Sequence, residues 1–182
     1  MIDELYYTGR FFSDKGHEHN YISGYYTKEF ANREATIKLM EIGMGNYGGS
    51  IDLWLEWFVN GTIVLIENDK KLVDFYIGKW GIRDRLEIIH ADAYDTNTLN
   101  MFEDNIFDWI IDDGPHTLES QIYSVTNWIS KVKQNGKLII EDIQNEKYIN
   151  ELNKVNTNPY KLIDLRKDKD RYDDFIYEIT KS

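Results

Sequence analysis

Four carboxylates and one imidazole follow two segments that have the composition of buried strands. They are Asp112, Asp113, His116, Glu141 and Asp142. If the two strands are neighbours, these groups converge at one edge of a sheet, where like charges repel unless some are protonated or a cation neutralises them. Neither segment has a lysine or arginine beside its end in the sequence. Hard oxygen ligands without a thiolate suit Mg²⁺ or a similar divalent ion, so we predict a metal site at Asp112, Asp113, Glu141 and Asp142. In the alternative interpretation, one acid of each pair caps the following helix and the other is solvated.

A glycine-rich segment follows an earlier strand-like run. Gly43, Gly45, Gly48 and Gly49 permit a tight turn and a close approach of a ligand to the backbone, and the next helix offers its N-terminal N–H groups. Glu41 precedes the first glycine at a place where dinucleotide sites usually have an apolar residue, and its carboxylate could meet the ammonium of a methionine group. The pattern therefore predicts a cofactor-binding loop, although a glycine-rich turn without a ligand has the same sequence.

Two further strand ends carry acids. Glu67 is placed to accept hydrogen bonds from both hydroxyls of a ribose, unless it only caps the next helix. Asp92 and Ala93 follow the third strand, where Asp92 could face the amino group of an adenine. His90 is expected to pack or to cap a helix. These residues predict a site for an adenosine-containing cofactor.

The elements that must position these residues alternate along the chain. A helix-like segment at 51–58 has its apolar residues on one face, and the run 62–66 is β-branched and bounded by turn signals. Five β-α alternations followed by two strands specify an α/β fold with a Rossmann-like open sheet, mostly parallel, with helices on both faces. Its ligands should lie at the carboxyl ends of the strands. The predicted strands are 37–42, 62–66, 85–90, 106–111, 137–141, 160–166 and 173–180, with a turn at 134–136; the predicted helices are 25–33, 51–58, 69–77, 98–102, 117–130 and 145–155.

Together, the acids and glycines of the first three strand ends resemble those of class I S-adenosylmethionine-dependent methyltransferases. That resemblance covers about residues 36–180 and implies a seven-stranded sheet whose last strand is antiparallel. The segment from Asp112 to His116 is similar to the metal-dependent sugar O-methyltransferases of the mycinamicin and macrocin type. It implies that Asp112 and Asp113 hold the metal and that His116 is the base. The stretch 14–21 resembles one that lies over the cofactor or substrate in those enzymes; it could equally be a cap that covers the sheet edge.

The resemblance implies an S-adenosylmethionine-dependent O-methyltransferase. Catalysis is assigned to His116 and Asp113; the cofactor contacts are assigned to Glu41, Gly43, Gly45, Gly48, Gly49, Glu67, Asp92, Ala93 and Asp112. We expect Mg²⁺ or a similar divalent cation to orient a hydroxylated small molecule, namely a sugar, sugar nucleotide or glycoside, and aromatic side chains of 21–26 to stack on it. An NAD-dependent oxidoreductase with the same glycine loop and a non-catalytic cofactor-binding subunit are the alternatives.

Composition limits the remaining possibilities. The 182 residues contain no cysteine, and the net charge of −11 disfavours a nucleic-acid partner. An apolar run long enough to cross a membrane is absent, and the acidic start of the chain does not resemble a secretory signal. We expect a single cytoplasmic domain over residues 1–182, with 1–35 as an N-terminal cap or lid, and a homo-oligomer is possible.

Overall fold

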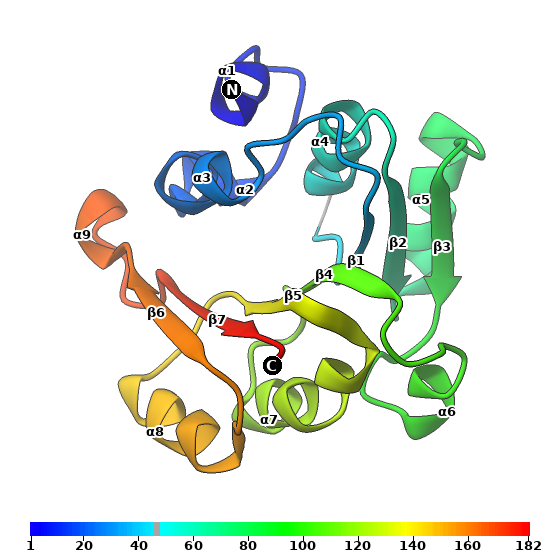
Figure 1. Cartoon of the computed structure of the whole chain (residues 1–182). Coiled ribbons are helices and arrows are strands. Elements are labelled where there is room, and N and C mark those ends of the chain that lie inside the picture. The colour runs from blue at the N-terminus through cyan, green and yellow to red at the C-terminus, as the bar shows by residue number, and fades with distance from the viewer. Residues whose placement is uncertain (46–47) are drawn as a thin grey trace.

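A seven-stranded sheet in the order β3-β2-β1-β4-β5-β7-β6 forms the centre of the computed structural model, which describes residues 1–45 and 48–182 (Figure 1). The strand pairs among β1 to β5 are parallel, whereas β7 is antiparallel to both β5 and β6. This confirms the predicted open sheet with an antiparallel last strand. The strands are β1 (Lys38–Ile42), β2 (Thr62–Glu67), β3 (Leu86–His90), β4 (Phe107–Asp112), β5 (Val132–Ile140), β6 (Tyr160–Asp164) and β7 (Phe175–Thr180).

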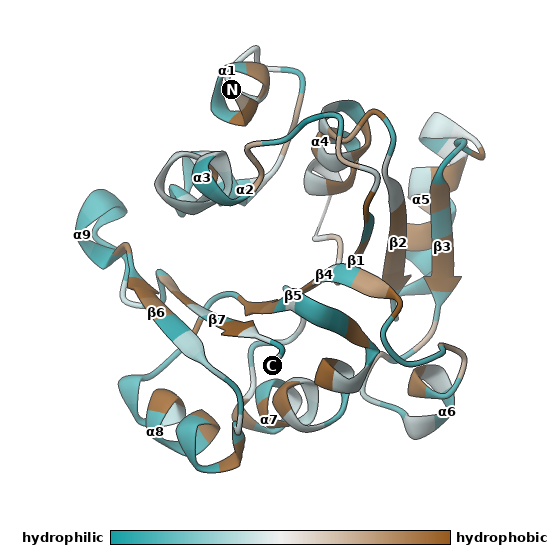
Figure 2. Ribbon diagram, in the orientation of Figure 1, coloured by the Kyte–Doolittle hydropathy of each residue, from teal (hydrophilic) through white to brown (hydrophobic). Residues whose placement is uncertain are grey.

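Helices cover both faces of the sheet. The N-terminal helices, α4 and α5 lie against one face, and α6, α7 and α8 lie against the other (Figure 1). Figure 2 shows hydrophobic residues concentrated in the strands and on the sides of helices that face them. The helical elements are α1 (Ile2–Tyr6), α2 (Asp14–His17), the π-helix Ile22–Tyr26, α3 (Thr27–Glu29), α4 (Gly49–Trp57), α5 (Lys70–Trp80), α6 (Thr96–Leu99), α7 (Leu118–Thr126), the 3₁₀ helix Trp128–Lys131, α8 (Glu146–Val155) and α9 (Arg166–Lys169).

Strand alternation divides the core into two layers. In β1, Leu39 packs in the layer beneath the N-terminal helices, whereas Met40 packs in the layer beneath α7. In β4, Ile111 packs in the layer beneath the N-terminal helices, and Ile110 packs in the layer beneath α7. Because successive side chains of a strand point to opposite faces, two acids next to each other at a strand end are also sent to different sides.

The predicted turn at 134–136 is wrong, because these residues lie within β5. Phe107 of β4 is paired with Val132, but Trp109, only two residues further on, is paired with Lys137. The extra residues of β5 form an irregularity of the bulge type, and Asn135 adopts a φ of 63° within it. A turn signal can thus mark a bulge inside one strand.

Several residues of 1–35 pack on one face of the sheet. Tyr6, Tyr21, Tyr26 and Phe30 of this segment are buried in the same cluster as residues of β1, β4, β5 and β7. The predicted short helix at 25–33 begins earlier, as a π-helix followed by the short α3. The N-terminal segment is therefore a layer of the fold that reaches across several strands.

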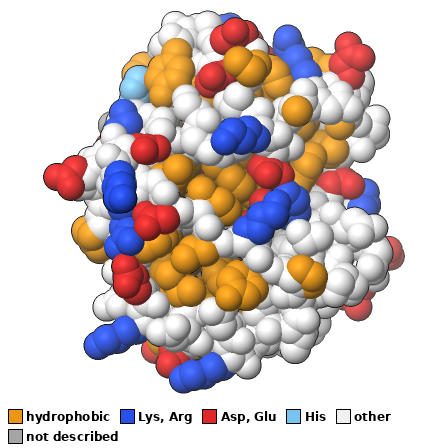
Figure 3. All heavy atoms as spheres, turned by 60° about the vertical axis from the view of Figure 1, so that its left-hand side comes forward, with side chains coloured by type: hydrophobic (Ala, Val, Ile, Leu, Met, Phe, Trp, Pro, Cys, Tyr) orange, Lys and Arg blue, Asp and Glu red, His pale blue; other side chains and the backbone are white. Residues whose placement is uncertain are grey.

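The edge strand β6 is largely exposed, including the side chains of Tyr160 and Leu162. Figure 3 shows the side of the molecule that is on the left of Figure 1, where hydrophobic side chains gather among basic and acidic ones. No helix within residues 1–45 and 48–182 is long and apolar enough to cross a membrane.

Candidate cofactor and metal site

Two cavities lie beside the glycine loop at the carboxyl ends of the strands. The first has a volume of about 220 Å³, and the second has a volume of about 270 Å³. The first is lined by Ile42, Gly43, Ile66, Glu67, Asn68, Ala91, Asp92, Ala93, Tyr94, Gly114 and Pro115. The second is lined by Phe12, Ser13, Asp14, His17, Glu18, Met44, Gly45, Gly49, Ser50 and Asp113. Most residues predicted to contact a cofactor therefore line one cavity or the other.

Backbone geometry explains the glycines of this loop. Gly43 has a φ of 84°, and a Cβ at this position would lie 2.3 Å from the carbonyl oxygen of Asp113. Gly48 has a φ of 64° and faces the ring of Tyr76. Gly45 has a φ of 55°, and the rest of the loop, residues 46 and 47, lies outside the described residues. The glycines permit both the turn and the close approach of two strand ends.

Glu67 lines the first cavity but does not cap α5, since the side chain of Asp69 fills that role. The carboxylate of Glu67 accepts hydrogen bonds from the backbone N–H groups of Met44 (3.1 Å) and Asp69 (2.7 Å). Asp92 lines the same cavity and accepts a hydrogen bond from the backbone N–H of Tyr94 (2.9 Å). Two carboxylates thus face the space predicted for the adenosine.

A compact group of ligand atoms forms where β4 and β5 end. Nε2 of His116 lies 3.8 Å from Oδ1 of Asp113 and 3.7 Å from Oδ2 of Asp142. One ligand atom from each residue falls within 4.8 Å of the others, as a shared cation would require. His116 and Asp142 have φ values of 55° and 54°, which non-glycine residues adopt rarely and which cluster at functional sites.

Asp112 does not join this group. Its carboxylate is buried and accepts hydrogen bonds from the hydroxyls of Tyr94 (2.6 Å) and Ser124 (2.6 Å) and from the N–H of Gly114 (3.2 Å). Burial raises the pKa of Asp112, an effect that these hydrogen bonds oppose. As the last residue of β4, Asp112 faces α7 rather than its neighbour's side of the sheet. The predicted convergence of all four acids is therefore wrong for Asp112.

The N-terminal segment supplies a cation that the sequence analysis missed. Nζ of Lys15 donates to Oδ2 of Asp113 (2.6 Å) and to Glu141, and it lies 3.3 Å from Oε1 of Glu41. Lys15 is buried; burial lowers its pKa, but the carboxylates outweigh this effect and raise the pKa well above its usual value. No lysine or arginine lies beside either strand end in the sequence, yet Lys15 compensates these acids although it is 126 residues away from Glu141 in the chain.

Glu41 and Glu141 are bound by the protein itself. Glu41 is fully buried, accepts a hydrogen bond from the indole of Trp54, and lines neither cavity. Glu141 accepts a hydrogen bond from Tyr26 (2.6 Å) in addition to that from Lys15. Burial raises the pKa of both carboxyl groups, against the lowering effect of Lys15. The ammonium beside Glu41 in this structure is thus that of Lys15.

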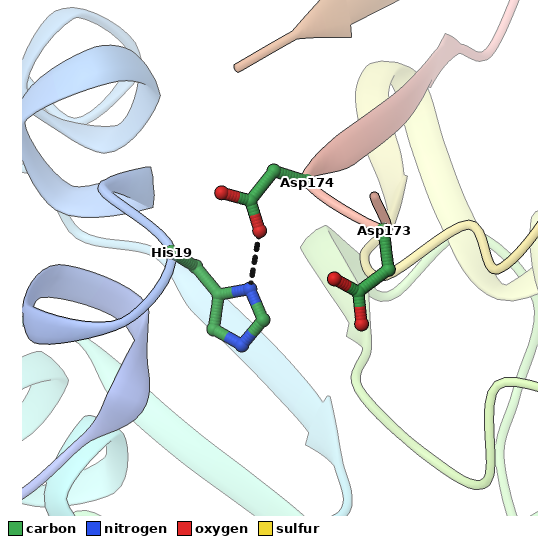
Figure 4. A group of neighbouring side chains, drawn as sticks. All are labelled: His19, Asp173 and Asp174. Atoms are coloured by element: carbon green, nitrogen blue, oxygen red, sulfur yellow. Dashed lines mark hydrogen bonds and ion pairs between the residues drawn. The ribbon is translucent and has the colours of Figure 1, made fainter. Parts of the chain in front are cut away.

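Two further residues of the N-terminal segment contact Asp142. The hydroxyl of Tyr21 donates to Oδ1 of Asp142, and Nδ1 of His19 lies 3.4 Å from the same oxygen. His19 is also 2.7 Å from Oδ1 of Asp174, with Asp173 close by (Figure 4). Because Tyr21 is buried, the expectation that aromatic residues of 21–26 stack on a ligand is wrong for it; Tyr25 and Tyr26 are likewise buried.

No family model matches the chain. Two curated proteins are similar in sequence. The 8-demethyl-8-alpha-L-rhamnosyl tetracenomycin-C 2'-O-methyltransferase of Streptomyces olivaceus is 26% identical over 140 residues, which are 72% of this chain and 35% of that protein. Demethylmacrocin O-methyltransferase of Streptomyces fradiae is 26% identical over 151 residues, which are 78% of this chain and 36% of that protein. The chain thus spans about a third of the length of these relatives.

Solved structures show the same fold. MycE methyltransferase from the mycinamycin biosynthetic pathway, in complex with Mg, SAH and mycinamycin VI, matches with a TM-score of 0.60 and 25% identity over 78% of this chain and 36% of that chain. An SAH-bound methyltransferase of Podospora anserina matches with a TM-score of 0.64 and 17% identity over 100% of this chain and 87% of that chain. The chain therefore has the fold of class I S-adenosylmethionine-dependent methyltransferases, and its sequence resembles those of the sugar O-methyltransferases of the mycinamicin and macrocin type.

Proposed function

We propose that this chain catalyses S-adenosylmethionine-dependent O-methylation of a small hydroxylated molecule: a sugar, a sugar nucleotide or a glycoside. The observation that carries the proposal is the position of Asp113, which lines the second cavity and belongs to the group with His116 and Asp142. Asp113 thus joins the second cavity to an imidazole and a further carboxylate. The names of the similar proteins support a sugar hydroxyl as the acceptor.

The first cavity fits the adenosine of the cofactor. Glu67 offers carboxylate oxygens to the ribose, and Asp92 and Ala93 line the place for the adenine. Gly43 lines this cavity, and Gly45 and Gly49 line the second one, beside which α4 begins. The bound cofactor would supply a methyl group already activated on a sulfonium.

Glu41 and Asp112 support the cofactor site indirectly in this proposal. Asp112 accepts hydrogen bonds from Tyr94 and Gly114, which both line the first cavity. Glu41 fixes Trp54 of α4 and lies beside Lys15. Glu41 and Asp112, two of the four acids predicted to contact the cofactor, would thus support residues behind the cavity walls.

The donor set also fits a divalent ion. Asp113 and Asp142 offer hard carboxylate oxygens beside a partly exposed histidine, and Mg²⁺ commonly binds to one or two carboxylates while it retains water. When bound, the ion would act as a Lewis acid and orient hydroxyl groups of the acceptor. Asp112 and Glu141, bonded to other partners, are not in this set.

His116 acts as the base in the proposed reaction. Its side chain remains 27% exposed, so an acceptor hydroxyl can reach the imidazole. As the acceptor oxygen bonds to the methyl carbon and the carbon–sulfur bond breaks, His116 takes the hydroxyl proton. Asp113 and Asp142 stabilise the positive charge that the imidazole gains.

Methyl transfer from radiolabelled S-adenosylmethionine to a panel of glycosides and sugar nucleotides tests the function. We expect label in at least one acceptor, and its loss in excess EDTA, with recovery when Mg²⁺ is returned. Calorimetric titration with S-adenosylmethionine and NAD compares the cofactors directly. Tight binding of NAD without binding of S-adenosylmethionine would contradict the proposal, and full activity in EDTA would contradict its metal part.

The organisation of the chain is part of the same proposal. Residues 1–182 form one domain, in which 1–35 are a cap that contributes Lys15, His19 and Tyr21 to the site. A cytoplasmic location and the possible assembly into a homo-oligomer stay predictions. Size-exclusion chromatography with light scattering measures the oligomeric state.

A further inference from the structure

The acid cluster already contains one fully enclosed cation. Nζ of Lys15 is surrounded by carboxylates from the ends of three strands: Asp113 at 2.6 Å, Glu141 in direct contact, and Glu41 at 3.3 Å. Oε1 of Glu41 is buried and has no hydrogen-bond partner among the described residues, so its nearest compensating charge is this ammonium. Three carboxylates thus have one ammonium as their shared counter-charge.

A second position for a cation lies next to the first. Asp113 directs Oδ2 to Lys15, whereas its Oδ1 belongs to the group with His116 and Asp142. The two positions therefore share a carboxylate and differ in accessibility. Lys15 is 1% exposed, whereas the side chains of Asp113 and His116 are 17% and 27% exposed. Only the second position is open to an ion from solution.

Packing holds the ammonium in the closed position. The backbone N–H of Lys15 donates to Oγ of Ser13 (3.3 Å), which caps the start of α2. Gly16 lies so close to the ring of Tyr6 that a Cβ there would be 2.1 Å from it. Tyr6 in turn donates to the carbonyl of Ser13 (2.5 Å). Lys15 is thus fixed at both its backbone and its charged end.

We propose that Lys15 determines where, and how many, divalent ions bind: its ammonium fills the position between Glu41, Asp113 and Glu141 and leaves a single site at Asp113 and Asp142, beside His116. This inference rests on the metal part of the proposed function. Without the ammonium, the three carboxylates are a second set of hard oxygen ligands for a divalent ion. Lys15 therefore limits the number of metal sites at this edge of the sheet.

Counting of bound Mn²⁺ by electron paramagnetic resonance tests the proposal. We expect one Mn²⁺ per chain in the wild type and two in Lys15→Ala. Lys15→Arg keeps the positive charge and should bind one ion. Lys15→Ala/Glu141→Gln loses one carboxylate of the opened position and should return to one ion. Lys70→Ala removes an exposed lysine paired with Asp74 and serves as the matched control, with one ion expected.

Other results would contradict the inference. If Lys15→Ala binds one ion with the affinity of the wild type, Lys15 does not control metal binding and the inference is wrong. If Lys15→Ala is unfolded without metal, its circular dichroism should recover in Mn²⁺, since the ion replaces the missing charge; failure to recover would also contradict the inference. A wild type that binds no Mn²⁺ would instead refute the metal part of the proposed function, and this inference with it.

Discussion

His116 and Asp142 hold their side chains on backbone conformations with positive φ, at the ends of two neighbouring strands. Such conformations cost about 1–3 kcal/mol each and persist where the surrounding structure imposes them. Here the result is that an imidazole and a carboxylate face each other at 3.7 Å. The two residues with strained backbone conformations thus belong to the group to which we assign the chemistry.

Replacement of His116 by alanine should remove the base but not the cofactor site. We expect turnover to fall by about 10²–10⁴-fold, while the Kd for S-adenosylmethionine changes little because His116 does not line the first cavity. Kinetics and calorimetry measure the two quantities. His90→Ala is the control, because His90 is an exposed histidine at the end of β3 and should leave turnover unchanged. Parallel loss of binding and turnover in His116→Ala would identify a structural role instead.

The buried Asp112 predicts a specific pH dependence of stability. Burial raises its pKa in the folded state, so its contribution to stability is present at low pH and is lost as the pH rises through the folded pKa. The Asp112→Asn variant has no carboxyl group at this position, so its stability does not fall in this way as the pH rises. The free energy of unfolding of the variant should therefore rise relative to the wild type as the pH increases from about 4, by up to about 1.4 kcal/mol per pH unit until the folded pKa of Asp112 is passed.

Urea unfolding over a pH series measures this difference. Asp104→Asn is the control with the opposite sign, because a hydrogen bond from Lys131 lowers the pKa of Asp104. The contribution of Asp104 is present at neutral pH and is lost as the pH falls through its folded pKa. If Asp112→Asn and the wild type keep a constant difference at all pH values, the carboxyl group of Asp112 is not perturbed as described.

The acids at strand ends could be found from the sequence, but their partners could not. Asp112 and Asp113 are adjacent, and only the phase of β4 decides that Asp112 meets Ser124 while Asp113 meets Lys15. Lys15 itself lies in a segment without sustained periodicity. Its contact with Glu141 joins distant parts of the chain, and no local pattern records such a pairing. The acid-rich rim was predictable, whereas its internal charge balance was not.

At the scale of elements, the contact between the N-terminal segment and α4 depends on a glycine. A Cβ on Gly49 would lie 2.0 Å from the carbonyl oxygen of Phe12. Gly49→Ala should therefore separate the two segments and lower the free energy of unfolding by about 1–3 kcal/mol. Gly78→Ala, in α5 with no atom within 4 Å of the new methyl, should stabilise by about 0.5–1 kcal/mol.

Urea unfolding and proteolysis of residues 1–35 distinguish these variants. We expect faster cleavage in Gly49→Ala and unchanged cleavage in Gly78→Ala. Equal stability of the two variants would mean that Phe12 does not pack on the start of α4 as described.

Elements with strong periodicity were predictable, and short polar elements were less so. The strands β1, β2, β4, β5 and β7 and the helices α4, α5, α7 and α8 follow apolar patterns that their burial explains. The short helix predicted at 98–102 lies instead at α6, Thr96–Leu99, where the Asp95 side chain caps it. The bulge in β5 had the sequence of a turn because both conformations use the left-handed region that Asn135 adopts.

At the scale of the whole molecule, the net charge of −11 acts against compactness. Added salt screens this repulsion, so raising the ionic strength from low to physiological should stabilise the fold by about 1 kcal/mol, or about 2–4 °C in Tm for a chain of this size. Differential scanning calorimetry measures the change. Sodium chloride and choline chloride should act alike because the effect is screening; a Tm that falls with salt would show that attractive ion pairs dominate.

The N-terminal cap has a consequence for the way the chain folds. Residues 15–26 contact Asp113, Glu141, Asp142 and Glu178, which follow them by about a hundred residues or more. During synthesis, the tyrosines of the cap leave the ribosome long before the strands that cover them exist. Contacts between such distant residues close large loops and form slowly. Until β5 and β7 have been made, the hydroxyls of Tyr21, Tyr25 and Tyr26 lack the carboxylates that accept their hydrogen bonds, so the N-terminal segment cannot complete its native contacts.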